Sequence, residues 1–260
     1  MRRANSQQEL QNKATSEFLS KGTFRFHGSD VLVFIPVHNE ECTIGRVIEK
    51  VKEDCNFDLL IIDDGSIDST PDILQNLDVE VLKHPICLGS SVIISGLEAA
   101  YSLGYKYVIK IDGDDQHNPR DIPRLYEHAI QTGADIVIGS RHLNGFSANI
   151  LSIQGSGMWF CSKLVSLLSR KRITDTTSGF KIWSRKACEV AIQAFKDGKL
   201  KEDSTYHVEE LIIAAKKKLE VEEISVVIRP REYGETKSYS KRKLIMFPPS
   251  LIRSTVRALF

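Results

Sequence analysis

The sequence predicts an α/β fold in which one mostly parallel sheet carries helices on both faces. Apolar, β-branched runs such as VLVFIPV, which begins at Val31, recur along the chain without internal polar alternation. Runs of this kind are typical of strands buried on both faces. A helical pattern separates each run from the next, which is the alternation that parallel sheets require. With 260 residues, 42% of them hydrophobic and 27% charged, the chain can bury a core without disulfides.

The alternation is regular as far as the run DIVIGS near residue 140. Thr70 and Pro71 mark a helix start, because proline is favoured at the first helical position. The other predicted helices in this half cover residues 43–52, 90–102 and 122–131. In the second half we expect an amphipathic segment over 150–170, helices near 185–196 and 208–218, and the strand VEEISVVI.

Three parts are expected along the chain: a polar N-terminal extension over 1–30, a catalytic domain over 31–240, and a basic amphipathic tail over 241–260. The five cysteines form no CxxC pair, which favours reduced thiols in a cytosolic compartment. The apolar stretches around 151–168 and 244–252 are interrupted by charges or prolines. Neither reaches the roughly 20 apolar residues of a membrane span, so we expect a cytoplasmic protein.

Positive charge is concentrated at the C-terminal end. Residues 229–260 hold eight Lys or Arg and two Glu, a net of +6, so the preceding residues carry 1 − 6 = −5. Such a tail favours peripheral contact with an anionic membrane surface, although a solvated charged face is an alternative. We expect no nucleic-acid partner, and a homo-oligomer is left open.

Ligands of open α/β sheets bind at the carboxyl ends of the strands, where this chain has PVHNEE, DDGSIDST, HPICLGSS and DGDDQH. A dinucleotide-binding GxGxxG does not follow the first strand, and no GxxxxGK[ST] exists. The last turn also fails as an EF-hand, because His117 and Pro123 occupy the positions that require Gly and Glu. Hydride transfer, P-loop chemistry and EF-hand calcium binding are therefore excluded.

Asp112 and Asp114 are two carboxylates that directly follow the apolar run YVIKI. Oxygen ligands of this kind suit Mg²⁺ or Mn²⁺, which typically takes one or two protein carboxylates and completes its shell with substrate phosphates. The second acidic turn, at Asp63 and Asp64, offers hydrogen-bond acceptors for a base. Alternatively, one of that second pair only caps its turn.

Taken together, these motifs resemble the inverting family-two glycosyltransferases of GT-A fold, particularly dolichyl- and polyprenyl-phosphate sugar synthases. The resemblance runs in the family's order from about Val31 to Lys237. It is carried by FIPVHNEE, IIDDGSIDST, IDGDDQHNP, GSR, TDTTSGFK, VEE and YGETKS.

The resemblance implies a role for each matching residue. It places Asp112 and Asp114 at the metal and in catalysis, with Gln116 as a further ligand. For the nucleotide it implies contacts with Pro36, Asn39, Glu40, Asp64, Asp68, Gly89 and Asp112. For donor or acceptor phosphate it implies Arg141, Lys181, Arg229, Arg231 and Lys237.

The chain departs from the family pattern at three places. Cys87 and Ser91 stand where Asn and Gly are expected in the third turn, and Lys181 stands where Arg is common. No Lys or Arg occurs between Phe146 and Met158, where the lipid-phosphate synthases tend to have one.

We therefore expect a metal-dependent inverting glycosyltransferase that uses a nucleotide-sugar and a polyprenyl-phosphate acceptor. Phosphate is favoured because it needs no general base, whereas a sugar hydroxyl does. Transfer to a glycan hydroxyl is the alternative, and the base would then be Glu209, which an ungapped alignment from the strand at 223–228 puts on the family's carboxylate. A sugar-phosphate nucleotidyltransferase would need a Gly-rich loop after the first strand. A non-catalytic binding module would be expected to lack one metal carboxylate.

Overall fold

The computed structural model describes residues 2–144, 153–201, 205–233 and 257. The described residues form a seven-stranded sheet in the order β3-β2-β1-β4-β6-β5-β7. Every strand pairs in parallel except β6, which runs antiparallel to β4 and β5. The strands are β1 (Val31–Val37), β2 (Asp58–Asp64), β3 (Glu80–His84), β4 (Tyr107–Lys110), β5 (Ile136–Ser140), β6 (Lys181–Ser184) and β7 (Val221–Ser225).

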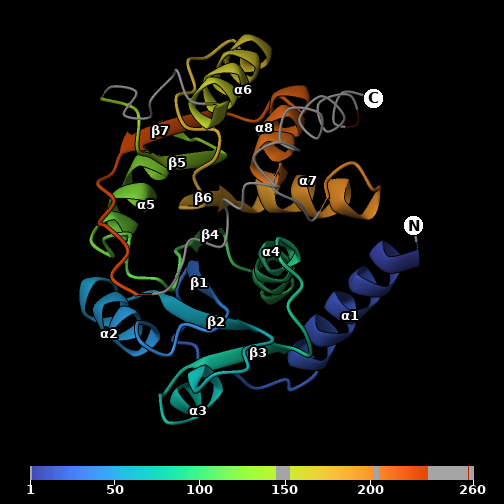
Figure 1. The fold of residues 1–260 in the computed structure, drawn as a ribbon, viewed down its shortest axis with the longest axis vertical. Coiled ribbons are helices and arrows are strands. Elements are labelled where there is room, and N and C mark those ends of the chain that lie inside the picture. Colours follow the sequence, from blue (N-terminus) through green and yellow to red (C-terminus); the bar gives the residue numbers. More distant parts are fainter. Residues whose placement is uncertain (1, 145–152, 202–204, 234–256, 258–260) are drawn as a thin grey trace.

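Helices cover both faces of this sheet, as the sequence predicts (Figure 1). One core packs α2, α3 and α5 on one face, and a second core packs α1, α4, α6, α7 and α8 on the other. The helices are α1 (Arg2–Leu19), α2 (Ile44–Asp54), α3 (Thr70–Gln75), α4 (Ser91–Leu103), α5 (Asp121–Thr132), α6 (Ile153–Ser169), α7 (Arg185–Lys196) and α8 (Tyr206–Lys216).

Helix α2 shows why the predicted helices form. Its residues Ile44, Val47, Ile48 and Val51 recur at helical spacing, and all four are buried on one side. Helix α7 begins at a side-chain cap, because the Ser184 hydroxyl accepts a hydrogen bond from the Ala187 N–H. Capping and one-sided burial thus account for helices that the sequence predicts to within one to three residues.

Two elements of the structure were not predicted. The short strand β6 has four residues and begins with Lys181. Its antiparallel pairing with β4 and β5 holds it in the sheet. Helix α1 occupies the expected polar extension, yet Ala14 and Phe18 are buried in the core beside α4. Both elements depend on partners that are distant in sequence.

Other sequence expectations concern the cysteines and the membrane. All five cysteines are free thiols. No helix among the described residues is long and apolar enough to cross a bilayer. Apart from Arg257, the predicted basic tail over 241–260 lies outside the described residues.

Candidate active site

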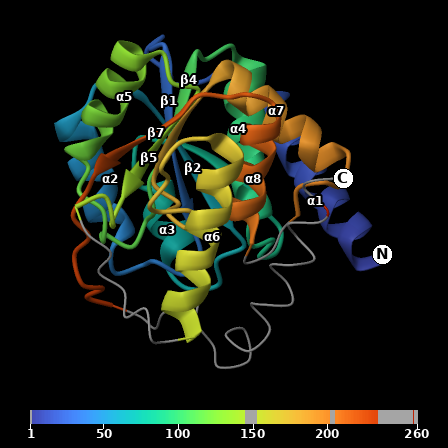
Figure 2. The same cartoon turned by 90° about the horizontal axis from the view of Figure 1, so that it is seen from above.

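Many of the predicted site residues lie at the carboxyl edge of the sheet, at the ends of β1, β2, β4 and β5 and on the loops that follow them (Figure 2). Gly89 follows β3, Arg229 and Arg231 follow β7, Lys181 begins β6, and Glu209 lies on α8. The strand register brings the ends of β1, β2 and β4 together. Val37 is opposite Asp63 at the ends of β1 and β2, and Phe34 is opposite Lys110 between β1 and β4. Because the strands are parallel, loops that are distant in sequence begin side by side.

The loops after β1 and β2 are joined by hydrogen bonds that involve predicted nucleotide-binding residues. Asn39, in the left-handed region at φ 56°, accepts a bond from the Ile67 N–H at 2.8 Å. The Glu40 N–H donates to the Thr70 hydroxyl at 2.9 Å. Asp68 accepts from backbone N–H groups in both loops, at 3.0 and 3.2 Å. These residues therefore fix the shape of the loops beside Pro36, whatever they bind.

Asp64 is buried and its carboxylate is occupied by the chain itself. It accepts hydrogen bonds from the Leu88 and Gly89 N–H groups at 2.9 and 3.1 Å. The His84 ring lies 2.7 Å away through Nδ1, and the Cys87 thiol donates at 3.2 Å. Asp64 thus holds the loop before α4 in place, and Cys87, a departure from the family pattern, is one of its partners.

The first of the two metal-turn carboxylates, Asp112, forms an ion pair with Lys110. Burial alone would raise the pKa of Asp112, but the nearby Lys110 ammonium outweighs it and lowers the pKa to about 2. The His117 Nε2 atom lies 3.7 Å from the same carboxylate, and burial lowers the pKa of His117. Asp112 is therefore ionised, and 37% of its side chain is exposed.

The second carboxylate, Asp114, is bound by the Arg231 guanidinium at 2.8 Å. The same guanidinium lies 3.4 Å from Glu40, so it links this turn to the loop after β1. Gln116 joins the turn to the segment after β7, because its side-chain amide donates to the Arg229 carbonyl at 3.1 Å. The Arg229 N–H donates in return to the Gln116 carbonyl at 2.9 Å. The structure thus brings Glu40, Asp114 and Arg231 together.

The donor set fits an oxygen-preferring divalent cation. Asp112 and Asp114 place two carboxylates at one strand end, and each is paired with a cationic side chain, Lys110 or Arg231, which shows that a positive charge is accepted at each of them. Among the described residues no group of three His, Cys, Asp or Glu side chains could hold a metal alone. The site therefore matches Mg²⁺ or Mn²⁺, which can take remaining ligands from water and substrate phosphates, and does not match a fully protein-bound metal.

A buried ionic network lies next to this turn. Lys181 is opposite Lys110 between β6 and β4, is fully buried, and donates to Glu210 at 2.8 Å. Burial would raise the pKa of Glu210, but the Lys181 charge outweighs it and lowers the pKa to about 2. Burial, reinforced by Lys181, lowers the pKa of His207 to about 4. At neutral pH the network therefore holds one cation, one anion and a neutral imidazole.

Gly179 lets this network approach the metal turn. A Cβ at that position would lie 2.7 Å from Lys110 Nζ, 3.5 Å from His207 Nε2 and 3.6 Å from Asp112 Oδ2. A side chain at this position would therefore displace the Lys110 ammonium, whereas it would only touch His207 and Asp112. The turn TDTTSGFK is one of the motifs that carry the family resemblance. Its Gly179 leaves room for the Lys110 ammonium, which a larger residue would displace.

Glu209 and Glu210 point to different sides of α8. Glu209 is fully buried and accepts hydrogen bonds from the Lys201 N–H at 2.9 Å and the Thr205 hydroxyl at 3.2 Å, and it forms an ion pair with Arg257. The structure does not bring Glu209 to Asp112. The ungapped alignment favours Glu209 over its neighbour Glu210, the second carboxylate of the VEE motif. In the structure Glu210 is joined to Lys181.

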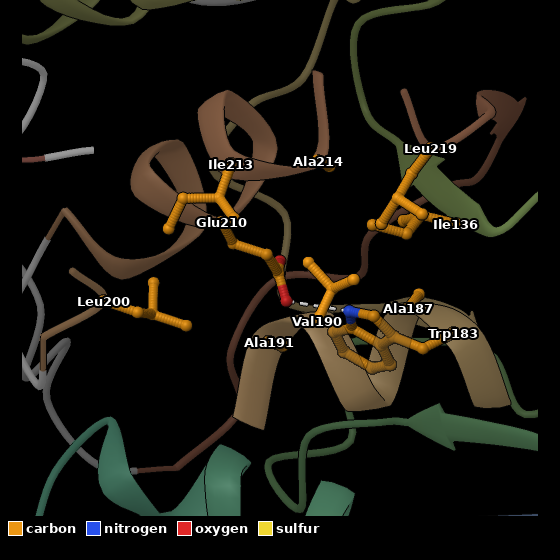
Figure 3. A pocket seen from close by; sticks show the side chains of 10 residues that line it. All are labelled: Ile136, Trp183, Ala187, Val190, Ala191, Leu200, Glu210, Ile213, Ala214 and Leu219. Carbon is orange, nitrogen blue, oxygen red and sulfur yellow. Dashed lines mark hydrogen bonds between the residues drawn. The ribbon is translucent and has the colours of Figure 1, made fainter. Parts of the chain in front are cut away.

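A small cavity of about 10 Å³ lies behind Glu210 and is lined mainly by apolar side chains (Figure 3). Figure 3 shows the Glu210 carboxylate directed at the Trp183 indole, whose N–H donates to it at 2.7 Å. A cavity of this size holds at most one water molecule. It is a packing gap in the core rather than a substrate pocket.

Arg141 closes the edge of the site beyond β5. Its guanidinium makes a bidentate pair with Asp175 at 2.6 and 2.7 Å and donates to the Thr177 hydroxyl at 2.6 Å. Burial would raise the pKa of Asp175, but Arg141 outweighs it and holds that pKa well below its usual value. Arg229 lies 3.8 Å from Asp115, and Lys237 lies outside the described residues.

Comparisons with known proteins agree with this architecture. Residues 32–190 match the profile described as Glycosyl transferase family 2. The UDP-N-acetylglucosamine–dolichyl-phosphate N-acetylglucosaminyltransferase of Methanococcus voltae is 29% identical, over 78% of this chain and 87% of the relative. The undecaprenyl-phosphate mannosyltransferase of Micrococcus luteus is 28% identical, over 80% of this chain and 86% of the relative.

A solved structure is similar in fold. Glucosyl-3-phosphoglycerate synthase from Mycobacterium tuberculosis, in complex with Mn²⁺, UDP and phosphoglyceric acid, superposes with a TM-score of 0.63. It is 18% identical, and the match covers 89% of this chain and 79% of that one. This likeness confirms the predicted α/β architecture of GT-A type.

Proposed function

The chain belongs to glycosyl transferase family 2, and we propose that it transfers one sugar, with inversion, from a nucleotide-sugar to a polyprenyl phosphate. The observation that carries this proposal is the pair Asp112 and Asp114 at the end of β4, each lying against a cation of the chain. Two relatives named for transfer to dolichyl or undecaprenyl phosphate support the acceptor class.

A divalent cation, Mg²⁺ or Mn²⁺, would be held by Asp112 and Asp114 with Gln116 nearby. When bound, it would offset the negative charge that the leaving nucleoside diphosphate gains. Arg231 adds a fixed positive charge at the same place, because its guanidinium lies 2.8 Å from Asp114. Charge placed where it develops in the transition state lowers the barrier without reorganisation.

The donor nucleotide would lie across the loops after β1 and β2. Asn39, Glu40 and Asp68 join these loops, and Asp64 fixes the neighbouring loop before α4 through Gly89. A pocket whose walls are hydrogen-bonded before binding loses little freedom when the ligand arrives.

The contacts of the two candidate general bases, Glu209 and Glu210, favour a phosphate acceptor over a sugar hydroxyl. Glu209 is buried against Lys201, Thr205 and Arg257, and Glu210 is paired with Lys181. Neither carboxylate is placed to take a proton from a sugar hydroxyl. A phosphomonoester is mostly dianionic at neutral pH and needs no base. Arg141, Arg229, Arg231 and Lys237 would bind it as the resemblance implies.

Such an acceptor places the reaction at a membrane face, and we propose peripheral association from the cytoplasmic side. The basic residues over 241–260 favour that attachment.

The test is transfer of radiolabelled sugar to a short polyprenyl phosphate or to a glycan hydroxyl, after a thermal-shift screen of UDP-, GDP-, CDP- and dTDP-sugars with and without Mn²⁺. We expect lipid-linked product that depends on Mn²⁺ or Mg²⁺ and survives in Glu209→Gln. Product on the glycan alone, abolished in Glu209→Gln, would instead establish the hydroxyl acceptor with Glu209 as its base. Binding of donor without any transfer would favour a non-catalytic module.

A further inference from the structure

The outer face of α6 exposes large apolar side chains together with basic ones. Trp159 is 44% exposed, Phe160 52% and Leu167 76%. Lys163 lies among them, with its Nζ 5.7 Å from the centroid of the Trp159 ring. Positions 159, 163 and 167 are four residues apart, so they follow one stripe along the helix.

The opposite face of α6 is firmly attached to the domain. Cys161 and Val165 are buried in the core shared with α8. The Ser166 hydroxyl donates to the Ile173 carbonyl at 3.1 Å and accepts from the Ile173 N–H at 2.9 Å, and Ser162 bonds to the same carbonyl. The exposed stripe therefore reflects how the helix packs, because its orientation is set by the buried side.

The charge of this region has one sign. Between Arg141 and Thr174 the sequence contains four Lys or Arg and no Asp or Glu. Lys171 is paired with Glu220 and Glu222. In the described part of the chain, Arg170 and Arg172 are exposed and make no ion pair. They extend the stripe of Lys163 with uncompensated positive charge.

We propose that this face of α6 lies on an anionic lipid bilayer, with Trp159, Phe160 and Leu167 among the headgroups and Lys163, Arg170 and Arg172 beside lipid phosphates. A helix with aromatic and aliphatic residues on one face, bordered by basic residues, is typical of helices that lie in the membrane interface. Trp favours that zone because its ring is apolar and its N–H is polar. The absence of carboxylates between Arg141 and Thr174 complements an anionic surface.

This placement has a consequence for the site. The segment that contains α6 begins after Arg141, which follows β5, and ends before Asp175, and these two residues form the bidentate pair at the edge of the site. A bilayer bound to α6 would hold that edge close to the lipid surface. The proposal concerns the surface alone and does not require the acceptor to be a lipid phosphate.

Vesicle binding tests the proposal on the full chain without donor or acceptor. With vesicles of phosphatidylglycerol and phosphatidylcholine in equal parts, Trp159→Ser/Phe160→Ser/Leu167→Ser should weaken co-sedimentation by at least about tenfold. Arg170→Gln/Arg172→Gln should weaken it by about fivefold per charge removed, and only for anionic vesicles. Matched controls are Ile130→Ser, a 52%-exposed apolar residue on α5, and Lys83→Gln/Lys201→Gln, two exposed lysines; both should bind like wild type.

Tryptophan emission gives an independent measurement. The chain has two Trp residues, and Trp183 is fully buried, so a blue shift on vesicle addition reports Trp159. Unchanged vesicle binding in the triple variant, or no shift in emission, would overturn the proposal and leave binding to other parts of the chain. Concentration-dependent self-association that the triple variant abolishes would also overturn it, in favour of a second copy as the occupant. Circular dichroism checks that each variant is folded.

Discussion

The two acidic turns on either side of β1 use their carboxylates in opposite ways. After β2, Asp64 accepts hydrogen bonds from two backbone N–H groups, His84 and Cys87, all within one local structure. After β4, Asp112 and Asp114 instead meet the charged ends of Lys110 and Arg231. Similar sequence patterns, DD and DGD at strand ends, thus give a structural anchor in one case and a site that attracts cations in the other.

The difference comes from what surrounds each turn. The turn after β2 faces the loop before α4. The Leu88 and Gly89 N–H groups of that loop donate to the Asp64 carboxylate. The turn after β4 faces long cationic side chains from the strand itself and from the segment after β7. A cation that is held by side chains can be replaced or joined by another, whereas backbone donors stay in place. Four substitutions or titrations test the roles assigned to the two turns and to the groups beside them.

The largest expected effect is on catalysis. Asp114→Asn should lower kcat by at least about 100-fold if, as proposed, this carboxylate holds the cation that stabilises the leaving group. Transfer assays with and without EDTA measure it. The control is Asp115→Asn, the adjacent carboxylate, which is bound to Arg46 and Lys50 on α2 and should retain activity within a few-fold. Full activity of Asp114→Asn in EDTA would refute the metal assignment.

The next effect is on stability. Asp64→Asn should lower the free energy of unfolding by about 2 kcal/mol, because an amide N–H₂ would face backbone N–H donors that then lose their acceptor. Urea unfolding measures the change, and Asp72→Asn, an exposed residue in the first turn of α3, should cost little. The metal dependence of transfer should survive in Asp64→Asn. If Asp64→Asn instead lost the metal dependence and kept its stability, the turn after β2 would be the metal site and not a structural anchor.

A further effect, which appears only below neutral pH, concerns the network beside the metal turn. The pKa of His207 falls from 6.5 to about 4 on folding, so the unfolded chain binds its proton first as the pH drops. Stability should therefore decline between about pH 6.5 and 4, by roughly 3 kcal/mol. The pKa of Glu210 falls from 4.5 to about 2, so a further decline follows over that range.

Urea unfolding at a series of pH values measures this decline. His207→Gln should flatten the part of the curve between pH 6.5 and 4. It should weaken the more acidic part without abolishing it, because Lys181 and His207 both lower the pKa of Glu210. An identical slope in wild type and variant would show that other groups cause the pH dependence.

The smallest effect is expected at Cys87. Cys87→Ser should change the free energy of unfolding by less than about 0.5 kcal/mol, because a thiol is a weak hydrogen-bond donor and a hydroxyl can replace it at Asp64. Thermal unfolding and initial transfer rates measure the outcome. A larger loss would mean that the sulfur has a packing role in the loop before α4.

Local patterns were enough to predict most helices and the parallel strands. Helices α2 and α7 have apolar residues at helical spacing, so their positions could be predicted from neighbouring residues. Strand β6 could not be predicted in this way, because its four residues begin with Lys181 and are too few to show a strand pattern. Helix α1 was missed because two of the four buried residues in its described part, Gln11 and Thr15, are polar, so Ala14 and Phe18 alone form its apolar side there.

The candidate site divides in the same way. Asp112 and Asp114 could be identified because they directly follow an apolar strand, whereas Arg231 was implied by the family resemblance. The structure joins Arg231 to Asp114. The choice between Glu209 and Glu210 could not be made from an ungapped alignment, because adjacent helical residues point about 100° apart.

The sequence by itself determined the fold class, the edge of the sheet where the site lies, and the carboxylates that attract a cation. These follow from apolar runs, turns and charges that act over a few residues. Only the tertiary structure decided which charges meet: Lys110 with Asp112, Arg231 with Asp114, Lys181 with Glu210, and Arg141 with Asp175. Three of these four pairs join residues 29 to 117 positions apart, and Coulomb attraction depends on distance in space, which only the packed sheet sets.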